Sequence, residues 1–433
     1  MYFCSRLKKP FAISELKQRA IKLSIPMVLG QLGLMLQGVT DVIMVGPLGD
    51  DYISSANMAN NVFFLLIAFF MGMLFSMSTV ISIKDGEGKR NNTPFTYKAG
   101  LVLSFTAAIL IILLNEKLVE LPNIPHETVP AGKSDSDNEL VYEEGNIPSL
   151  PNNAKPHWEL ASEYDIIDFD LGSKITGSGF PVYKGKGAKL QRALINFFLD
   201  RNTSAGYTEF QVPHLVNSQS AFATGQLPDK DGQMYHVIND DFYLIPTAEV
   251  PLTNIYRDTK VSIEKLPILL TGYTPCFRRE AGSYGSDVRG LNRLHQFDKV
   301  EIVRLEHPDN SSKALTGMKE HIKSILSELE LDFRILNLCA GDLGFTSSIT
   351  YDFELYSKGQ KKWLEISSVS NFKTYQSNRL NLKFKNKDGK NHLLHTLNGS
   401  SLALPRVMAG LIENNQSKDG IKIPKALVPF TGF

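Results

Sequence analysis

Residues 274–301 read TPCFRREAGSYGSDVRGLNRLHQFDKVE. An apolar run leads into a cluster of charge, a Gly/Ser loop follows, and a second run returns with further charged and aromatic residues. In that second run Arg293, Phe297 and Glu301 are spaced four apart, and residues four apart on a strand share a face. The stretch therefore predicts two antiparallel strands joined by a loop, with charged side chains lining one side of a site.

A plainer interpretation of the same stretch is a hairpin with a solvated charged face. We favour this interpretation for Arg279 and Asp298. For the other charged residues we favour the interpretation that they line a site. Activation of a carboxylate by ATP needs guanidinium groups for the phosphates, because they donate paired hydrogen bonds to oxygen. It also needs an aromatic face for the purine, and carboxylates for a substrate ammonium and a divalent ion. Residues 274–301 contain this set in order.

The stretch resembles the second signature motif of class II aminoacyl-tRNA synthetases, in the form typical of seryl-tRNA synthetases. The resemblance extends from about Val119 to Phe433. It implies that Arg278 is catalytic, binding the α-phosphate of ATP and contacting serine. The other contacts that it implies are Arg279, Glu280 (adenine amino group), Arg293 (γ-phosphate) and Phe297 (stacked on adenine) for ATP, and Glu301 for serine.

Three further segments resemble the same family. In residues 244–249 (LIPTAE), a serine-recognition loop is implied, with Thr247, Ala248 and Glu249 binding serine. Residues 363–368 (WLEISS) resemble a strand whose implied ATP-binding residues are Glu365, Ile366, Ser367 and Ser368. Of these, Glu365 and Ser368 are the implied Mg²⁺ ligands, and a hard cation with oxygen ligands fits that role.

The last segment resembles the third class II motif. Residues 395–400 (HTLNGS) are followed by Leu404-Pro405-Arg406. The resemblance implies that Asn398 and Ser400 bind serine and that Arg406 is a second catalytic, ATP-binding residue. An arginine that enters a helix after an apolar strand is otherwise an ordinary surface residue. The first class II motif, which builds a dimer interface, is matched by an amphipathic helix over Ala188–Asn202 and a strand over Gly206–Pro213, so we expect a homodimer.

The expected fold of residues 115–433 is thus α+β, with the antiparallel sheet of class II synthetases flanked by helices. The expected activity is that of an ATP-dependent, AMP-forming serine–tRNA ligase, with ATP and Mg²⁺ as cofactors and serine and tRNA(Ser) as partners.

Only three cysteines occur in the chain, Cys4, Cys276 and Cys339, without a CxxC pair. Their spacing excludes a disulfide framework and disfavours structural zinc. With a net charge of +1, RNA contact must depend on a local patch.

The first quarter of the chain has a different character. Apolar runs extend over Leu23–Gly46, where Asp41 is the one acidic residue, over Ala56–Ile83 and, more briefly, over Ala99–Leu114. A spanning helix needs about 20 apolar residues to cross a hydrocarbon layer of about 30 Å. The first two runs meet that length and the third is marginal, so residues 21–114 predict two or three transmembrane helices. Buried core helices are the weaker alternative, because soluble helices carry a polar face.

These runs also resemble a family. Pro26, Gln31 and Asp41, followed by VGPLG at residues 45–49, resemble the first helix and loop of a multidrug and toxic-compound extrusion (MATE) transporter. In that family an aspartate at the Asp41 position belongs to the cation-coupling site. A transporter of this kind needs about a dozen helices in two halves. Three spans cannot build the substrate cavity that lies between two such halves. Asp41 is therefore expected to be a remnant of the transporter sequence and not a working cation site.

The expected organisation is therefore a cytoplasmic segment over residues 1–20, transporter-like membrane helices over 21–114 and a catalytic domain over 115–433. Basic residues before the first run place the N-terminus in the cytoplasm by the positive-inside rule. Catalysis is expected in the cytoplasm, with membrane attachment through residues 21–114. The helical arm with which seryl-tRNA synthetases grip tRNA is absent from residues 21–114, so we expect weak tRNA charging. Two alternative functions are a truncated MATE-type antiporter and an amino acid–carrier protein ligase.

Overall fold

The computed structural model describes residues 120–145, 154–229, 232–280 and 289–433, with seven isolated positions between Thr79 and Ile109. The chain divides into two compact units, Met1–Val119 and Glu120–Phe433. The predicted membrane helices of residues 21–114, with Asp41, lie outside the described residues apart from those seven positions. Among the residues that are described, no helix combines the length and the apolar character needed to cross a membrane.

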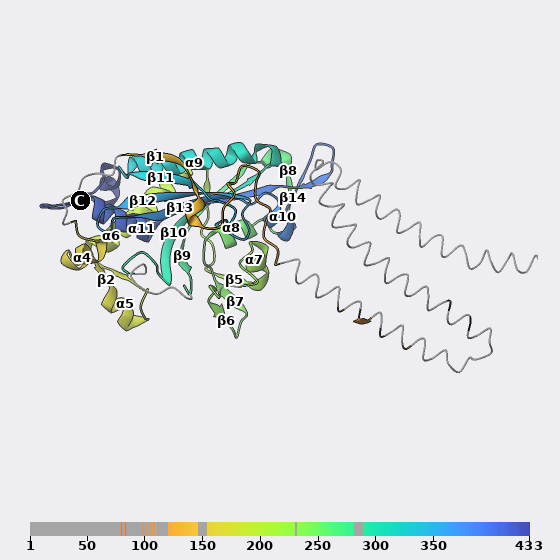
Figure 1. The fold of residues 1–433 in the computed structure, drawn as a ribbon, viewed down its shortest axis with the longest axis horizontal. Coiled ribbons are helices and arrows are strands. Elements are labelled where there is room, and N and C mark those ends of the chain that lie inside the picture. The colour runs from red at the N-terminus through yellow and green to blue at the C-terminus, as the bar shows by residue number, and fades with distance from the viewer. Residues whose placement is uncertain are drawn as a thin grey trace, which may run out of the picture. The chain divides into compact units, whose positions relative to one another are not determined.

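The second unit is built on an eight-stranded sheet (Figure 1). Every neighbouring pair in it is antiparallel except β9 and β4, which are parallel. In spatial order the strands are β1 (Glu139–Glu144), β11 (Phe333–Asn337), β12 (Ile349–Ser357), β13 (Lys362–Asn371), β16 (His395–Ala403), β10 (Gln296–Glu306), β9 (Ile268–Phe277) and β4 (Thr208–Glu209). The predicted antiparallel sheet with flanking helices is confirmed.

The quoted stretch forms strands as expected, with one correction. Strands β9 and β10 pair antiparallel, with Gln296 opposite Phe277 and Leu305 opposite Ile268. Strand β10 begins only at Gln296, so Arg293 lies in the turn that precedes it and not on the strand. The four-residue spacing therefore places Phe297 and Glu301 on one strand face, while Arg293 reaches the same region from a turn.

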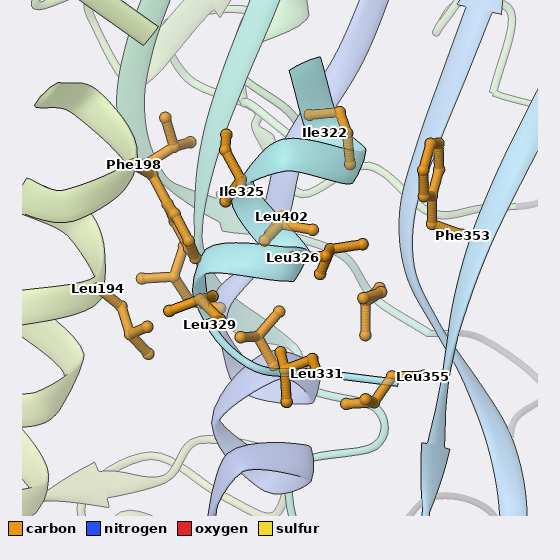
Figure 2. Close-up of a cluster of buried hydrophobic side chains, with 14 of the residues drawn as sticks. Leu194, Phe198, Ile322, Ile325, Leu326, Leu329, Leu331, Phe353, Leu355 and Leu402 are labelled. Atoms are coloured by element: carbon orange, nitrogen blue, oxygen red, sulfur yellow. The ribbon is translucent and has the colours of Figure 1, made fainter. Parts of the chain in front are cut away.

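Three helices pack on the sheet and contribute to its main hydrophobic core. They are α6 (Lys186–Ser204), α9 (Ser311–Glu328) and α11 (Leu404–Asn414). Apolar residues on α6 recur with helical spacing at Leu190, Leu194, Phe197 and Phe198, and all four are buried. Figure 2 shows Leu194 and Phe198 of α6 beside the buried side chains of α9, with Phe353 and Leu355 of β12 on the far side.

The remaining elements surround this framework (Figure 1). The other helices are α4 (His157–Glu163), α5 (Phe169–Ile175), α7 (Ser218–Ala223), α8 (Glu249–Asn254), α10 (Tyr375–Arg379) and α12 (Val428–Thr431). The other strands are β2 (Ile167–Asp168), β3 (Val182–Tyr183), β5 (Leu215–Asn217), β6 (His236–Val237), β7 (Phe242–Leu244), β8 (Lys260–Ser262), β14 (Lys383–Lys385), β15 (Asn391–Leu393), β17 (Gln416–Ser417) and β18 (Gly420–Ile421). Short 3-10 turns occupy Asp135–Asp137, Ile263–Lys265, Pro308–Asn310 and Lys425–Leu427.

The first-motif prediction holds for its helix and partly for its strand. The helix predicted over Ala188–Asn202 lies within α6. The strand predicted over Gly206–Pro213 is reduced to β4, after which Phe210 N–H donates to Thr271 O at 2.8 Å. This parallel pairing places β4 at the edge of the sheet.

Candidate active site

Segments from five parts of the sequence meet over the central strands and line two adjoining pockets. Both pockets are lined by Arg278, Glu280, Arg293, Lys299, Glu365 and Ser400. We call the first the Phe297 pocket; its other lining residues are Leu291, Asn292, Leu294, Phe297, Ile366, Ser367, Ala403, Pro405 and Arg406. We call the second the Glu249 pocket; its lining includes Thr247, Glu249, Thr346, Ser347, Asp352, Ser368 and Asn398.

In the Phe297 pocket Arg278 lies beside an aromatic ring, and a second arginine enters the lining from α11. The Arg278 guanidinium carbon lies 5.3 Å from the ring centroid of Phe297. Arg278 makes one long hydrogen bond, from Nε to Pro246 O at 3.4 Å, and has no carboxylate partner in the described ranges. A guanidinium that lacks a carboxylate partner retains its donors for an incoming anion. The first turn of α11 brings in Arg406, which donates from Nε to Asn292 O at 3.1 Å.

Glu365 and Glu280 each pair with an arginine of this pocket. Arg406 Nη1 donates to the backbone oxygen of Glu365 at 2.7 Å and to its Oε2 at 3.2 Å. Arg293 Nη1 lies 3.0 Å from Glu280 Oε2. Glu280 has φ +47°, in the left-handed region that residues with a side chain rarely adopt. Such strain tends to persist at functional sites, where the surrounding structure holds it in place.

The Glu249 pocket is built around two buried carboxylates. Glu249 Oε1 accepts from Gln376 Nε2 at 2.6 Å, and its Oε2 accepts from Asn398 Nδ2 at 2.6 Å. The same Asn398 amide donates to Glu301 Oε1 at 3.2 Å, and Thr247 Oγ1 donates to Glu301 Oε2 at 3.2 Å. One hydrogen-bonded network thus connects the turn before α8 with β10, β16 and α10. It presents negative charge and hydroxyl groups in the second pocket.

Burial perturbs Glu249 strongly. Desolvation, together with the nearby negative charge of Glu301, raises the pKa of Glu249 to about 7. Hydrogen bonding from Gln376 and the positive charges of Lys299 and Arg278 act in the opposite direction. A carboxyl group so poised changes its charge near neutral pH, and perturbed groups of this kind concentrate at functional sites.

A second carboxyl group with a perturbed pKa marks a candidate cation site. Desolvation and the charge of Glu365 raise the pKa of Asp352 well above its usual range. Its Oδ1 atom is buried and has no hydrogen-bond partner in the described part of the chain. Asp352 on β12 lies directly opposite Ser368 on β13. These oxygen donors fit Mg²⁺, which is typically held by one or two carboxylates together with substrate phosphates.

Most of the sequence-predicted residues line one of the two pockets, and three do not. Arg279 lies with its guanidinium carbon 5.9 Å from the ring centroid of Tyr235, outside both pockets. Ala248 is fully buried. Glu301 is also fully buried, beneath the Glu249 pocket, and is connected to it through Thr247 and Asn398.

Sequence reasoning missed two groups that the structure brings to the site. Lys299 lines both pockets, and its Nζ lies 2.6 Å from Glu301 Oε2. Lys299 could have been found, because it shares the strand face of Phe297 and Glu301 at two-residue spacing. Asp352 had no such signal, because only the register of β12 against β13 places it opposite Ser368.

Comparisons with known proteins found similar sequences and structures. A family model described as tRNA synthetase class II core domain (G, H, P, S and T) matches residues 235–415. The serine–tRNA ligase of Salinibacter ruber is 54% identical over 320 residues, which cover 73% of this chain and 75% of that protein. The serine–tRNA ligase of Hydrogenobaculum sp. is 50% identical over 311 residues, covering 72% of this chain and 74% of that protein.

Solved structures show the same likeness. Seryl-tRNA synthetase from Pyrococcus horikoshii, crystallised with ATP, superposes with a TM-score of 0.76 at 30% identity, covering 91% of this chain and 95% of that chain. The N-terminal part matches a different family model, MatE, over residues 26–121, in agreement with the MATE-like sequence found there. The matches to the class II core and to these relatives show that this chain belongs to the serine–tRNA ligase family.

Proposed function

We propose that the two pockets bind ATP and serine side by side and catalyse formation of seryl-adenylate. A carboxylate oxygen of serine attacks the α-phosphorus of ATP, and the bond from that phosphorus to the bridging oxygen breaks. Pyrophosphate leaves with the bonding electrons. The observation that carries this proposal is the convergence of Arg278 and Arg406 with the Glu249–Glu301 network on one cleft.

The Phe297 pocket suits ATP. The ring of Phe297 offers an aromatic face for adenine, and Glu280 offers an acceptor for its amino group. Arg278 and Arg406 reach the transferring phosphate, and Arg293 reaches the end of the triphosphate. Fixed positive charges stabilise the charge that develops at phosphorus, because they need no reorganisation at the moment of reaction.

The Glu249 pocket suits serine. Its carboxylates attract the ammonium group, while Thr247, Asn398 and Ser400 supply hydrogen-bonding groups for the substrate. A site built to bond a hydroxyl rejects analogues lacking it by about 10⁴ or more, because its buried polar groups would be left unpaired. The buried position of Glu249 and Glu301 supports this kind of selection against alanine and glycine.

Mg²⁺ fits between the two pockets. Glu365 and Ser368, with Asp352 as a third donor, would hold it together with phosphate oxygens of ATP. When bound, the ion would neutralise charge on the triphosphate. Its positive charge would also satisfy the buried Oδ1 of Asp352, which has no hydrogen-bond partner among the described residues.

The test is serine-dependent exchange of pyrophosphate into ATP by the full chain. Arg278→Ala is expected to reduce exchange by about 10²-fold or more, as removal of a transition-state donor does. The matched control is Arg201→Ala on α6, because Arg201 pairs with Glu328 at 2.7 Å and lines neither pocket. Unchanged exchange in Arg278→Ala would refute the assignment of that residue.

We further infer that transfer of serine to tRNA(Ser) is much slower here than in relatives that carry the helical arm. The MatE match over residues 26–121 supports this, because transporter-like sequence stands where the family's arm is expected. Charging of tRNA(Ser) is compared with pyrophosphate exchange in the same preparation. Charging as fast as that of an arm-containing relative would contradict the inference.

A homodimer is part of the same proposal. The surface between α6 and β4 carries apolar and aromatic side chains, Ile195, Leu199, Phe210 and Tyr273 among them. Two polar atoms there, Tyr183 OH and Gln191 Oε1, are buried without a hydrogen-bond partner in the described part of the chain. A second copy packed on this face would cover it. Light scattering at micromolar concentration checks this, and a monodisperse monomer would refute it.

We also propose that residues 21–114 attach the protein to a membrane with the catalytic unit on the cytoplasmic side. The MatE match and the apolar runs support attachment. The need for ATP and tRNA supports the cytoplasmic side. Protease accessibility of the catalytic unit in intact cells tests this placement, because a unit cleaved from outside would contradict it.

A further inference from the structure

We propose that Asn123 is a positioning residue for the Glu249 pocket, which we also call the serine pocket. Asn123 acts through the loop that joins β11 to β12. This inference rests on the proposed assignment of the Glu249 pocket to serine. Asn123 belongs to the segment Leu121–His126, which begins two residues after the boundary between the two units of the chain. It does not itself line either pocket.

The loop that Asn123 contacts forms one wall of the serine pocket. It runs from Leu338 to Ser348 between β11 and β12 and contains no helix or strand. The lining residues that it contributes are Leu338, Gly344, Thr346 and Ser347. Without a strand or helix of its own, such a loop depends on other segments for its backbone hydrogen bonds.

Asn123 supplies several of those bonds. Its backbone N–H donates to Phe345 O at 2.9 Å. Its side-chain Nδ2 donates to Thr346 O at 2.9 Å and to Phe372 O at 2.9 Å. Thr346 belongs to the loop and Phe372 directly follows β13, and both line the Glu249 pocket. One side-chain amide therefore joins two walls of that pocket.

The side chain is held in this orientation by its neighbours. The other amide atom, Oδ1, accepts from Ile124 N at 2.8 Å, so the Nδ2 group faces the two carbonyls. On the C-terminal side, His126 N donates to Ser348 O at 2.7 Å, and Ser348 Oγ donates to Ile124 O at 2.9 Å. Hydrogen bonds thus run from the segment Leu121–His126 to the loop and from the loop back to the segment.

The same segment is also bonded to the helix that supports Glu249. Tyr375 OH on α10 donates to Leu121 O at 3.0 Å. The next residue of α10, Gln376, donates to Glu249 Oε1. Leu121–His126 therefore contacts both the loop wall and the helix beside the buried carboxylate. The residues lining the Phe297 pocket include none from the loop, so loss of Asn123 should affect serine more than ATP.

The experiment measures KM for serine and for ATP by pyrophosphate exchange with the full chain. Asn123→Ala and Asn123→Asp both remove the two donations, and Asp also retains an acceptor toward Ile124 N. Each is expected to raise KM for serine about tenfold and to leave KM for ATP within about twofold. An unchanged KM for serine, or an equal rise for ATP, would overturn the inference.

Asn414→Ala is the matched control. Asn414 also bonds two backbone groups, donating from Nδ2 to Tyr356 O at 2.9 Å and accepting from Lys358 N at 3.1 Å, but it lines neither pocket. It is expected to lower the melting temperature as Asn123→Ala does while leaving both KM values unchanged. A rise in KM for serine in Asn414→Ala equal to that in Asn123→Ala would show general destabilisation instead. If the unmodified chain showed no serine-dependent exchange, the proposed function would fail and this inference with it.

Discussion

Serine binding should be linked to the release of a proton from Glu249. Burial and the charge of Glu301 raise the pKa of this carboxyl group to about 7 in the ligand-free pocket. The ammonium group of serine favours the ionised carboxylate, because an opposite charge nearby stabilises the charged form. Below pH 7 part of the binding free energy of serine is therefore used to remove the proton.

The expected size of the effect follows from that pKa. If only the ionised form binds, KM for serine contains the factor 1 + 10^(pKa − pH), which is about 11 at pH 6 and about 1.1 at pH 8. KM for serine should thus fall about tenfold between pH 6 and pH 8. KM for ATP should change little in this range, because Glu249 does not line the Phe297 pocket.

The assay is pyrophosphate exchange at a series of pH values, with serine varied at saturating ATP. Glu249→Gln is the control, because its amide does not titrate. This variant should show a higher KM for serine, by about tenfold or more for a lost charged hydrogen bond, and no dependence on pH in this window. A flat profile in the unmodified chain, or the same slope in Glu249→Gln, would refute the reasoning.

Two further outcomes test other parts of the structure. Asp352→Asn should raise the Mg²⁺ concentration for half-maximal exchange about tenfold or more, as loss of a metal-supporting carboxylate does, and an unchanged Mg²⁺ titration would remove Asp352 from the site. His157→Ala should lower the free energy of unfolding by about 3 kcal/mol, because it removes the buried hydrogen bond between Nδ1 and Glu413 Oε1 at 2.7 Å and leaves Leu291 N, which donates to Nε2 at 2.8 Å, without its acceptor. Urea denaturation measures this, and an unshifted midpoint would contradict the importance of the pair.

Local sequence was sufficient to predict the strands around residues 274–301 and the amphipathic helix within α6. Both depend on the periodic spacing of apolar residues over short stretches of chain, which can be seen directly in the sequence. It was likewise sufficient to nominate Arg278, Phe297, Glu365 and Arg406, all of which line the Phe297 pocket. The family resemblance extended that nomination to segments far apart in the chain.

Other features depended on tertiary structure. Whether Arg279 faces the cleft or Tyr235 depends on how the end of β9 packs. The meeting of Asp352 with Ser368 depends on strand register. The raised pKa of Glu249 depends on burial beside Glu301, which lies 52 positions away in the chain. The sequence by itself determined which chemical groups were available and which local elements carried them. Their contacts, burial and proton affinities were decided only by folding, because these properties arise between segments that no local pattern connects.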